Sequence, residues 1–218
     1  PCIGLSHQIA ALHPTSPKPE ETDMLGKFIM KNYAPASTSY GFHFKTYHDH
    51  IYTPVIRESV RQLDPKDQGH YTVYLPSYDD AHLLKNLSKF PDVHWDVYSK
   101  HNKSKFTVKN VTINPIQSDT FVNSMANASG VLCGAGFETP AEALFLQKKL
   151  LVIPMKNQYE QHLNAAALEQ MGVPVIGSLK KKFDYAIESW LNSKSKVMVD
   201  YPNMTREIVT NIVEKHTP

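Results

Sequence analysis

The chain contains little cysteine, almost no excess charge and no long apolar run. Only Cys2 and Cys133 are cysteines among 218 residues, too few for a disulfide framework. Lys and Arg number 23 and Asp and Glu 21, and a formal net charge of +2 gives no general attraction to nucleic acid. No apolar run approaches the roughly 20 residues that span a bilayer, and the chain does not open on a signal-like leader. We expect a cytoplasmic protein that does not bind nucleic acid, with peripheral contact to a membrane left open.

The chain opens in a segment that has the pattern of a β-strand, Pro1 to Ser6, and lacks an initiator Met. We therefore expect it to be a portion of a longer protein, with part of the active site outside it. Its 41% of apolar residues are still enough to bury a full core.

The first 66 residues are predicted to be largely irregular. We expect a strand at 2–5, helices at 20–33 and 55–63, and a loop at 35–41. Several prolines interrupt this part, and proline fits neither the interior of a helix nor a central strand.

From residue 69 the apolar pattern becomes regular. Strands are expected at 71–75, 93–98, 111–113, 131–133, 150–153 and 173–176, and helices at 79–90, 119–127 (capped by Ser118), 138–147, 159–171, 183–191 and 204–215. Strands that alternate with helices of this length predict a parallel sheet covered on both faces. We therefore predict an α/β fold with a Rossmann-like domain over residues 67–218.

A glycine turn lies between one of these strands and the next helix. The residues are Gly134, Ala135 and Gly136, and the helix is expected from Glu138. Glycine lets backbone N–H groups come close to an anion, and the amino end of a helix adds partial positive charge. A tight turn without a ligand is the alternative. We predict that Gly134 to Gly136 bind a phosphate group.

Glu142 lies one helical turn beyond this site, among small or apolar neighbours. A solvated helix acid is the alternative, and for Glu138 we prefer it. We predict that the Glu142 carboxylate accepts the two hydroxyls of a ribose.

Two other loops should reach the same edge of the sheet. Glu160, Gln161 and Asn164 follow one strand, and their amides and carboxylate suit a polyhydroxylated ligand. Ile116 and Gln117 follow another strand, where the backbone could hold a flat base.

Three closely spaced histidines, His43, His48 and His50, suggest a metal site at first sight. Aromatic residues separate them, and no Cys or acid pair completes a ligand set. We expect a loop or edge strand here, and no metal.

Taken together, these segments resemble the C-terminal, donor-binding half of GT-B glycosyltransferases, most closely the MurG-like, UDP-sugar-dependent family. The likeness runs from about residue 69 to 191. It is carried by Gly134-Ala135-Gly136, Pro140-Ala141-Glu142-Ala143, Val152-Ile153-Pro154 and Glu160-Gln161-His162-Leu163-Asn164-Ala165.

The resemblance assigns a role to each predicted site residue. It implies that the glycine turn takes the diphosphate, Glu142 the ribose and Ile116 and Gln117 the uracil. Glu160 and Gln161, before Asn164, would contact the donor sugar. Glu160 departs from the usual Gln or Asp, which leaves the sugar open. Pro76-Ser77-Tyr78 also departs, since relatives often carry a Gly-Gly-Ser turn there.

The first part of the chain resembles the junction between the two halves of such enzymes. Ile3 to Gln8 is similar to the last strand of the acceptor domain, and Tyr52 to Arg57 to the crossing into the donor domain. This implies that residues 1–66 are a remnant of the acceptor domain with its linker. The usual general base would lie in the missing part, and His7 is the nearest candidate within the chain.

We expect the donor-binding portion of a glycosyltransferase that moves a sugar from a nucleotide-diphospho-sugar, UDP-linked, to an unknown acceptor with inversion. No metal or other cofactor is expected. The portion alone is expected to be inactive. One alternative is a UDP-sugar epimerase of the same fold, against which we count the absence of Arg between Lys156 and Asn164. Another is a non-catalytic nucleotide-sugar-binding subunit that needs a partner.

Overall fold

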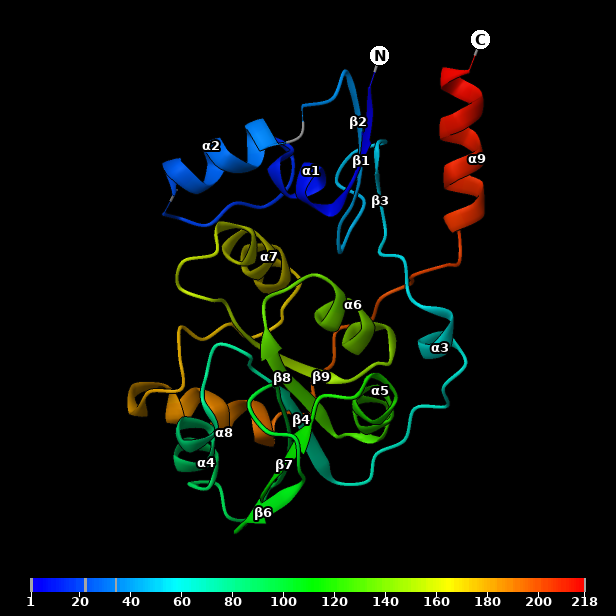
Figure 1. Ribbon diagram of the computed structural model, residues 1–218. Helices are drawn as coiled ribbons and strands as arrows, with labels where there is room; N and C mark the ends of the chain where they lie inside the picture. Colours follow the sequence, from blue (N-terminus) through cyan, green and yellow to red (C-terminus); the bar gives the residue numbers. More distant parts are fainter. Residues whose placement is uncertain (1, 22, 34, 218) are drawn as a thin grey trace.

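The structure, a computed structural model, describes residues 2–21, 23–33 and 35–217. Its larger sheet has six strands in the order β6-β7-β5-β4-β8-β9 (Figure 1). They are β4 (His70–Tyr74), β5 (His94–Ser99), β6 (Phe106–Val108), β7 (Val111–Pro115), β8 (Gly130–Gly134) and β9 (Lys149–Ile153). All neighbours pair in parallel except β6, which runs antiparallel to β7. The carboxyl ends of the five parallel strands therefore share one edge.

Helices cover both faces of this sheet. One face carries α5 (Ser118–Asn127), α6 (Glu138–Phe145) and α7 (Tyr159–Gln170), and the other carries α4 (Asp80–Leu87) and α8 (Asp184–Asn192). The central strand β8 shows why: Val131 and Cys133 pack with the first group of helices, and Leu132 between them packs with the second. Continuous apolar runs suit strands buried on both faces. The predicted α/β fold is confirmed.

The N-terminal part is more ordered than the sequence suggested. Three parallel strands, β1 (Ile3–Leu5), β2 (Thr38–Phe42) and β3 (Ile51–Tyr52), form a second sheet in that order. The helices α1 (His7–Leu12), α2 (Met24–Tyr33) and α3 (Glu58–Arg61) belong to this part. The expected loop at 35–41 is wrong, because β2 forms the centre of the sheet. Pairing with distant strands on both sides overrides the weak local signal.

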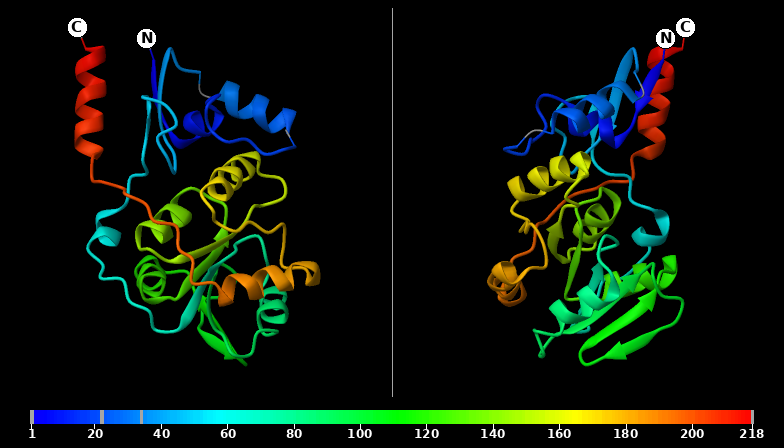
Figure 2. Two further views of the ribbon diagram at one scale, coloured as in Figure 1. Left: turned by 180° about the vertical axis from the view of Figure 1, so that it is seen from behind. Right: turned by 60° about the vertical axis from the view of Figure 1, so that its left-hand side comes forward.

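The C-terminal helix α9 (Thr205–His216) returns to this N-terminal sheet, and both chain ends lie at the same end of the molecule (Figures 1 and 2). Ile208 and Ile212 pack on Tyr40 of β2, whose hydroxyl lies 3.1 Å from Nε2 of His216. A short 3₁₀ turn, η1 (Lys181–Phe183), precedes α8. The boundary that we placed at residue 66 stays a prediction. The helix α9 lies after that boundary in sequence and packs on the N-terminal sheet.

Three smaller expectations differ from the structure. Residues 173–176 make only an isolated bridge, Val152 with Val175, because Pro174 lacks the N–H that a ladder needs. Gln117, not Ser118, precedes α5, and its side chain makes no capping bond. The strand β6 was missed because its turn holds Lys109 at φ 55°, without the Asn-Gly or Asp-Gly pair that marks most such hairpins. Among the described residues, no helix is long and apolar enough to span a membrane.

Candidate functional site

The glycine turn joins the end of β8 to the start of α6, at the carboxyl edge of the sheet. The space beside Gly136 is open: a Cβ atom built there would meet no atom within 4 Å. At Gly134 a Cβ would lie 3.5 Å from Oε1 of Gln161. Phe137, just before α6, gives the helix no side-chain cap. The first N–H groups of α6 are therefore not capped by that residue, and an anion at the open side of the turn would meet them.

Asn164 holds this turn from behind. Its side chain is fully buried, and its amide nitrogen donates to the carbonyl oxygen of Ala135 at 3.1 Å. Its amide oxygen lies 2.7 Å from Nε2 of His7, the first residue of α1. Asn164, one of the predicted ligand-binding residues, thus links the N-terminal part to the glycine turn.

His7 is the other half of this link. Its Nδ1 lies 2.8 Å from the carbonyl oxygen of Phe42, and its ring stacks on Phe137 with centroids 3.8 Å apart and planes 9° apart. Burial lowers the pKa of His7, while the hydrogen bonds to Phe42 and Asn164 and the carboxylate of Glu160 oppose that shift. Both ring nitrogens face oxygen atoms of the protein, so neither is positioned to take the proton from the hydroxyl of an acceptor substrate.

Glu142 forms a two-pronged ion pair with Arg57. Nε of Arg57 lies 2.6 Å from Oε1 of Glu142, and Nη2 lies 2.8 Å from Oε2. Glu142 is buried, whereas the Arg57 side chain is about half exposed and also reaches Oγ of Ser118 at 3.4 Å. The hydrogen bond to Glu142 raises the pKa of Arg57 above its ordinary value. Sequence reasoning missed this partner, although Arg57 ends the segment that resembles the interdomain crossing.

The loop after β9 lies against the same turn. Oε1 of Gln161 accepts a hydrogen bond from the N–H of Met155 at 3.0 Å, which fixes the side chain beside Gly134. Oε2 of Glu160 accepts one from Nε2 of Gln8 at 2.9 Å, and its Oε1 is 4.0 Å from Nε2 of His7. Gln161 therefore lies beside the glycine turn, whereas Glu160 contacts Gln8 and His7 of α1.

Ile116 and Gln117 are exposed directly after β7. The strands β5 and β4 separate β7 from β8. The strands β7 and β8 are thus three strand spacings apart, which places this loop about 14 Å from the glycine turn. The two loops lie on one edge without touching, so an extended ligand would have to bridge them.

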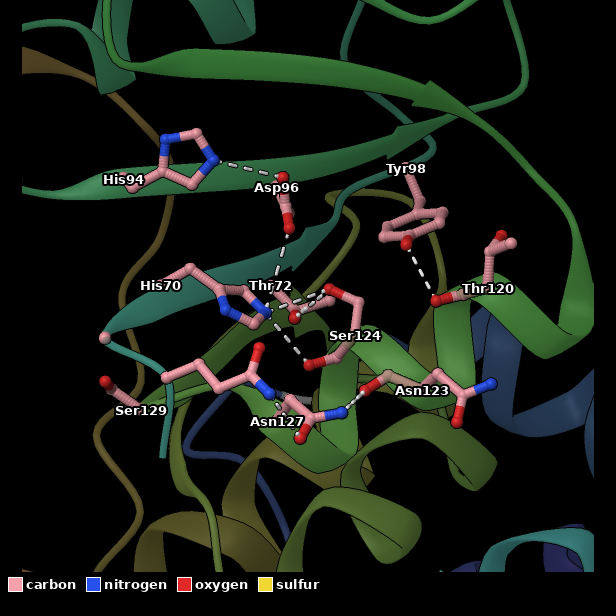
Figure 3. Close-up of polar contacts among 12 residues, drawn as sticks. His70, Thr72, His94, Asp96, Tyr98, Thr120, Asn123, Ser124, Asn127 and Ser129 are labelled. Carbon is pink, nitrogen blue, oxygen red and sulfur yellow. Dashed lines mark hydrogen bonds and ion pairs between the residues drawn. The ribbon is translucent and has the colours of Figure 1, made fainter. Parts of the chain in front are cut away.

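A second polar cluster lies at the amino ends of the strands (Figure 3). Oδ1 of Asp96 is 3.3 Å from Nε2 of His94, and its Oδ2 is 3.8 Å from Nε2 of His70, which also lies 3.2 Å from Oγ of Ser124. His70 and His94 begin β4 and β5, at the edge opposite the glycine turn. Within 2–21, 23–33 and 35–217, no group of three or more His, Cys, Asp or Glu is arranged to hold a metal ion.

A groove of about 590 Å³ lies apart from these residues. It is lined in part by Phe44, Lys45 and residues 195–201, and it includes none of the predicted site residues. The size of the groove does not indicate what it would bind. The glycine turn, in contrast, has open space beside Gly136 and leads into a helix whose first N–H groups receive no side-chain cap from Phe137. We therefore take the carboxyl edge of the sheet as the candidate site.

Comparison with known proteins shows the family to which this α/β fold belongs. The family model described as Glycosyl transferase family 1 matches residues 6–193. The chain belongs to that family. Comparison with curated proteins finds no match.

Sixty chains of solved structures match. The glycosyltransferase of kitacinnamycin is 17% identical with a TM-score of 0.53, over 78% of this chain and 50% of that one. SnogD from Streptomyces nogalater is 10% identical with a TM-score of 0.46, over 85% of this chain and 59% of that one. VinC in complex with dTDP is 11% identical with a TM-score of 0.44, over 84% and 50%. At this identity the first likeness shows the fold, and the chain spans about half the length of these structures.

Proposed function

We propose that this chain is the donor-binding portion of an inverting glycosyltransferase that uses a nucleotide-diphospho-sugar, UDP-linked as in MurG-like enzymes. The observation that carries the proposal is the open space beside Gly136 at the uncapped start of α6. The diphosphate would lie there, with the base near Ile116 and Gln117 on the same edge. The donor sugar would meet Glu160 and Gln161.

The chemistry follows from the charge that develops on the leaving diphosphate. Backbone N–H groups of the turn and the positive end of α6 are fixed before the reaction, so they stabilise this charge without reorganising. This is how the site would dispense with a metal ion. The acceptor hydroxyl would be activated by a base outside this chain, since both nitrogens of His7 are engaged.

Glu142 can serve the ribose while it stays paired with Arg57. An ionised carboxylate offers about four acceptor positions, and the two bonds to Arg57 occupy two of them. The remaining positions could accept two ribose hydroxyls. Arg57 would then hold the Glu142 carboxylate in one orientation.

The experiment is a calorimetric titration of the chain with UDP, dTDP, GDP and uridine. We expect UDP to bind most tightly and uridine, which lacks the diphosphate, far more weakly. Tighter binding of dTDP or GDP than of UDP would show that we assigned the wrong base, and it would leave the placement of the diphosphate unchanged. Equal affinity for UDP and uridine would contradict the placement of the diphosphate, and interconversion of UDP-sugars by the chain would favour an epimerase instead.

A further inference from the structure

Both ring nitrogens of His7 face an oxygen atom, the carbonyl of Phe42 and the side-chain oxygen of Asn164. The Asn164 amide cannot be turned round, because its nitrogen donates to the carbonyl of Ala135 and the reverse orientation would set two oxygens together. A neutral imidazole has one N–H and leaves one of the two acceptors unmatched. Only the imidazolium form donates to both.

The same link fixes the direction of the glycine turn. In a trans peptide the carbonyl and the following N–H point in opposite directions. Because Asn164 holds the carbonyl of Ala135, the N–H of Gly136 is directed away from Asn164. The space beside the Gly136 Cα is also open. The stack of His7 on Phe137 holds the next residue of the turn in place as well.

The other groups that face His7 act in opposite directions. From α7, the carboxylate of Glu160 lies 4.0 Å from Nε2 and favours the charged ring. From the end of β2, the ring of His43 lies 5.2 Å away, and a charge there would oppose one on His7. Phe44 and Phe137 are the other neighbouring rings and carry no charge. Burial lowers the pKa of His7 against these hydrogen bonds and Glu160. An anion bound at the turn would add to the influence of Glu160.

We propose that His7 is the positioning residue of the diphosphate subsite: as an imidazolium it holds the glycine turn through Asn164 and Phe137 and places a positive charge behind it. The inference rests on the proposed function, because it takes the ligand to be a diphosphate. The diphosphate and the ring are then coupled, so that binding of the one favours protonation of the other. Binding takes up a proton, and affinity falls as the pH rises.

The test uses inorganic pyrophosphate beside UDP, because pyrophosphate carries the shared chemistry without the base or ribose. Calorimetric titrations run from about pH 5.5 to about pH 8.5, the range in which a histidine titrates. The variant is His7→Phe, which keeps a ring against Phe137 and removes both donors. The control is His94→Gln, at the opposite edge of the sheet. Ionisation of the ligand itself is common to all three proteins, so their difference isolates His7.

We expect the wild type and His94→Gln to lose about tenfold more affinity than His7→Phe as the pH rises, the effect of a shift of one pKa unit on binding. Without any variant, nitrogen-15 spectra of the wild type should show the pKa of His7 rising when pyrophosphate is added. A pKa that stays unchanged, or one pH profile for wild type and His7→Phe, would overturn the inference and leave the proposed function standing. If neither pyrophosphate nor UDP binds the wild type, the inference on His7 and the proposed function are both contradicted.

Discussion

Arg57 and Glu142 lie 85 residues apart, yet both carboxylate oxygens of Glu142 are held by the guanidinium of Arg57, at 2.6 and 2.8 Å. Arg57 stands before α3, in the segment that leads from the N-terminal part to the larger sheet, and Glu142 stands in α6. The pair therefore fastens that segment to α6, the helix that follows the glycine turn. Because Glu142 is buried, it depends on this partner.

Replacing Arg57 should weaken the fold. Arg57→Gln leaves a buried carboxylate short of hydrogen bonds, and we expect a loss of about 1–3 kcal/mol in the free energy of unfolding. Glu142→Gln in the same protein should restore part of it. Urea unfolding of the single and double variants measures this coupling, with the exposed Arg206→Gln in α9 as the control. Additive effects of the two substitutions would show that the pair contributes nothing.

Glu142 should distinguish nucleotides from bare phosphates. Glu142→Ala removes the acceptor for the ribose hydroxyls, and charged hydrogen bonds of this kind contribute about 1.5–3 kcal/mol. We expect UDP affinity to fall by more than about tenfold, while pyrophosphate affinity hardly changes. Glu169→Ala, which removes an exposed acid near the end of α7, is the matched control. Equal losses for UDP and pyrophosphate would refute the ribose role.

The stability of the chain should fall in mild acid because of His43. Burial, with a smaller effect from the neighbouring His7, lowers the pKa of His43 from 6.5 to about 3 in the folded chain. The unfolded chain then binds more protons than the folded one below pH 6.5, so stability present above that pH is lost as the pH falls. From pH 7 to pH 5 this group alone accounts for about 2 kcal/mol.

His43→Phe keeps a buried ring and removes the titration. We expect its free energy of unfolding to change less than that of the wild type between pH 7 and pH 5, measured by urea unfolding at each pH. The same pH dependence in both proteins would show that protonation of His43 does not lower the free energy of unfolding.

The chain by itself should transfer no sugar. Both nitrogens of His7 are engaged, and the acceptor would be positioned and deprotonated by groups outside these residues. Incubation with UDP-sugars and candidate acceptors, followed by mass spectrometry, should show binding without product. Steady turnover would place the catalytic base within this chain.

The sequence alone predicted the elements in which a local apolar pattern coincides with burial in the core. The apolar runs around Leu132 and Leu151, and the glycines after the first of them, predicted β8, β9 and the turn between β8 and α6. Tertiary contacts decided the rest. The strand β2 depends on partners on both sides, and α9 lies on Tyr40 of a sheet that precedes it by some 170 residues of chain.

The assignment of the site residues stays a prediction, and the sequence did not indicate how these residues are connected. Nothing local to Asn164 indicates that its two ends join Ala135 to His7, and nothing near Glu142 indicates Arg57. Such links arise when residues distant in sequence share one edge of a sheet. Sequence patterns show which residues can hydrogen-bond and leave their partners open.

The most direct test of the account is the affinity of UDP for Gly136→Val. A valine at this position would fill the open space beside the turn, where we place the diphosphate. Apart from its two chain neighbours, no described residue has an atom within 4 Å of the added Cβ. Ala81→Val, on the exposed side of α4, is the control for an added side chain of similar size. We predict that Gly136→Val folds as stably as the wild type and binds UDP at least about tenfold more weakly, whereas Ala81→Val binds it normally. A folded Gly136→Val protein with unchanged affinity for UDP would contradict the placement of the diphosphate at Gly134 to Gly136.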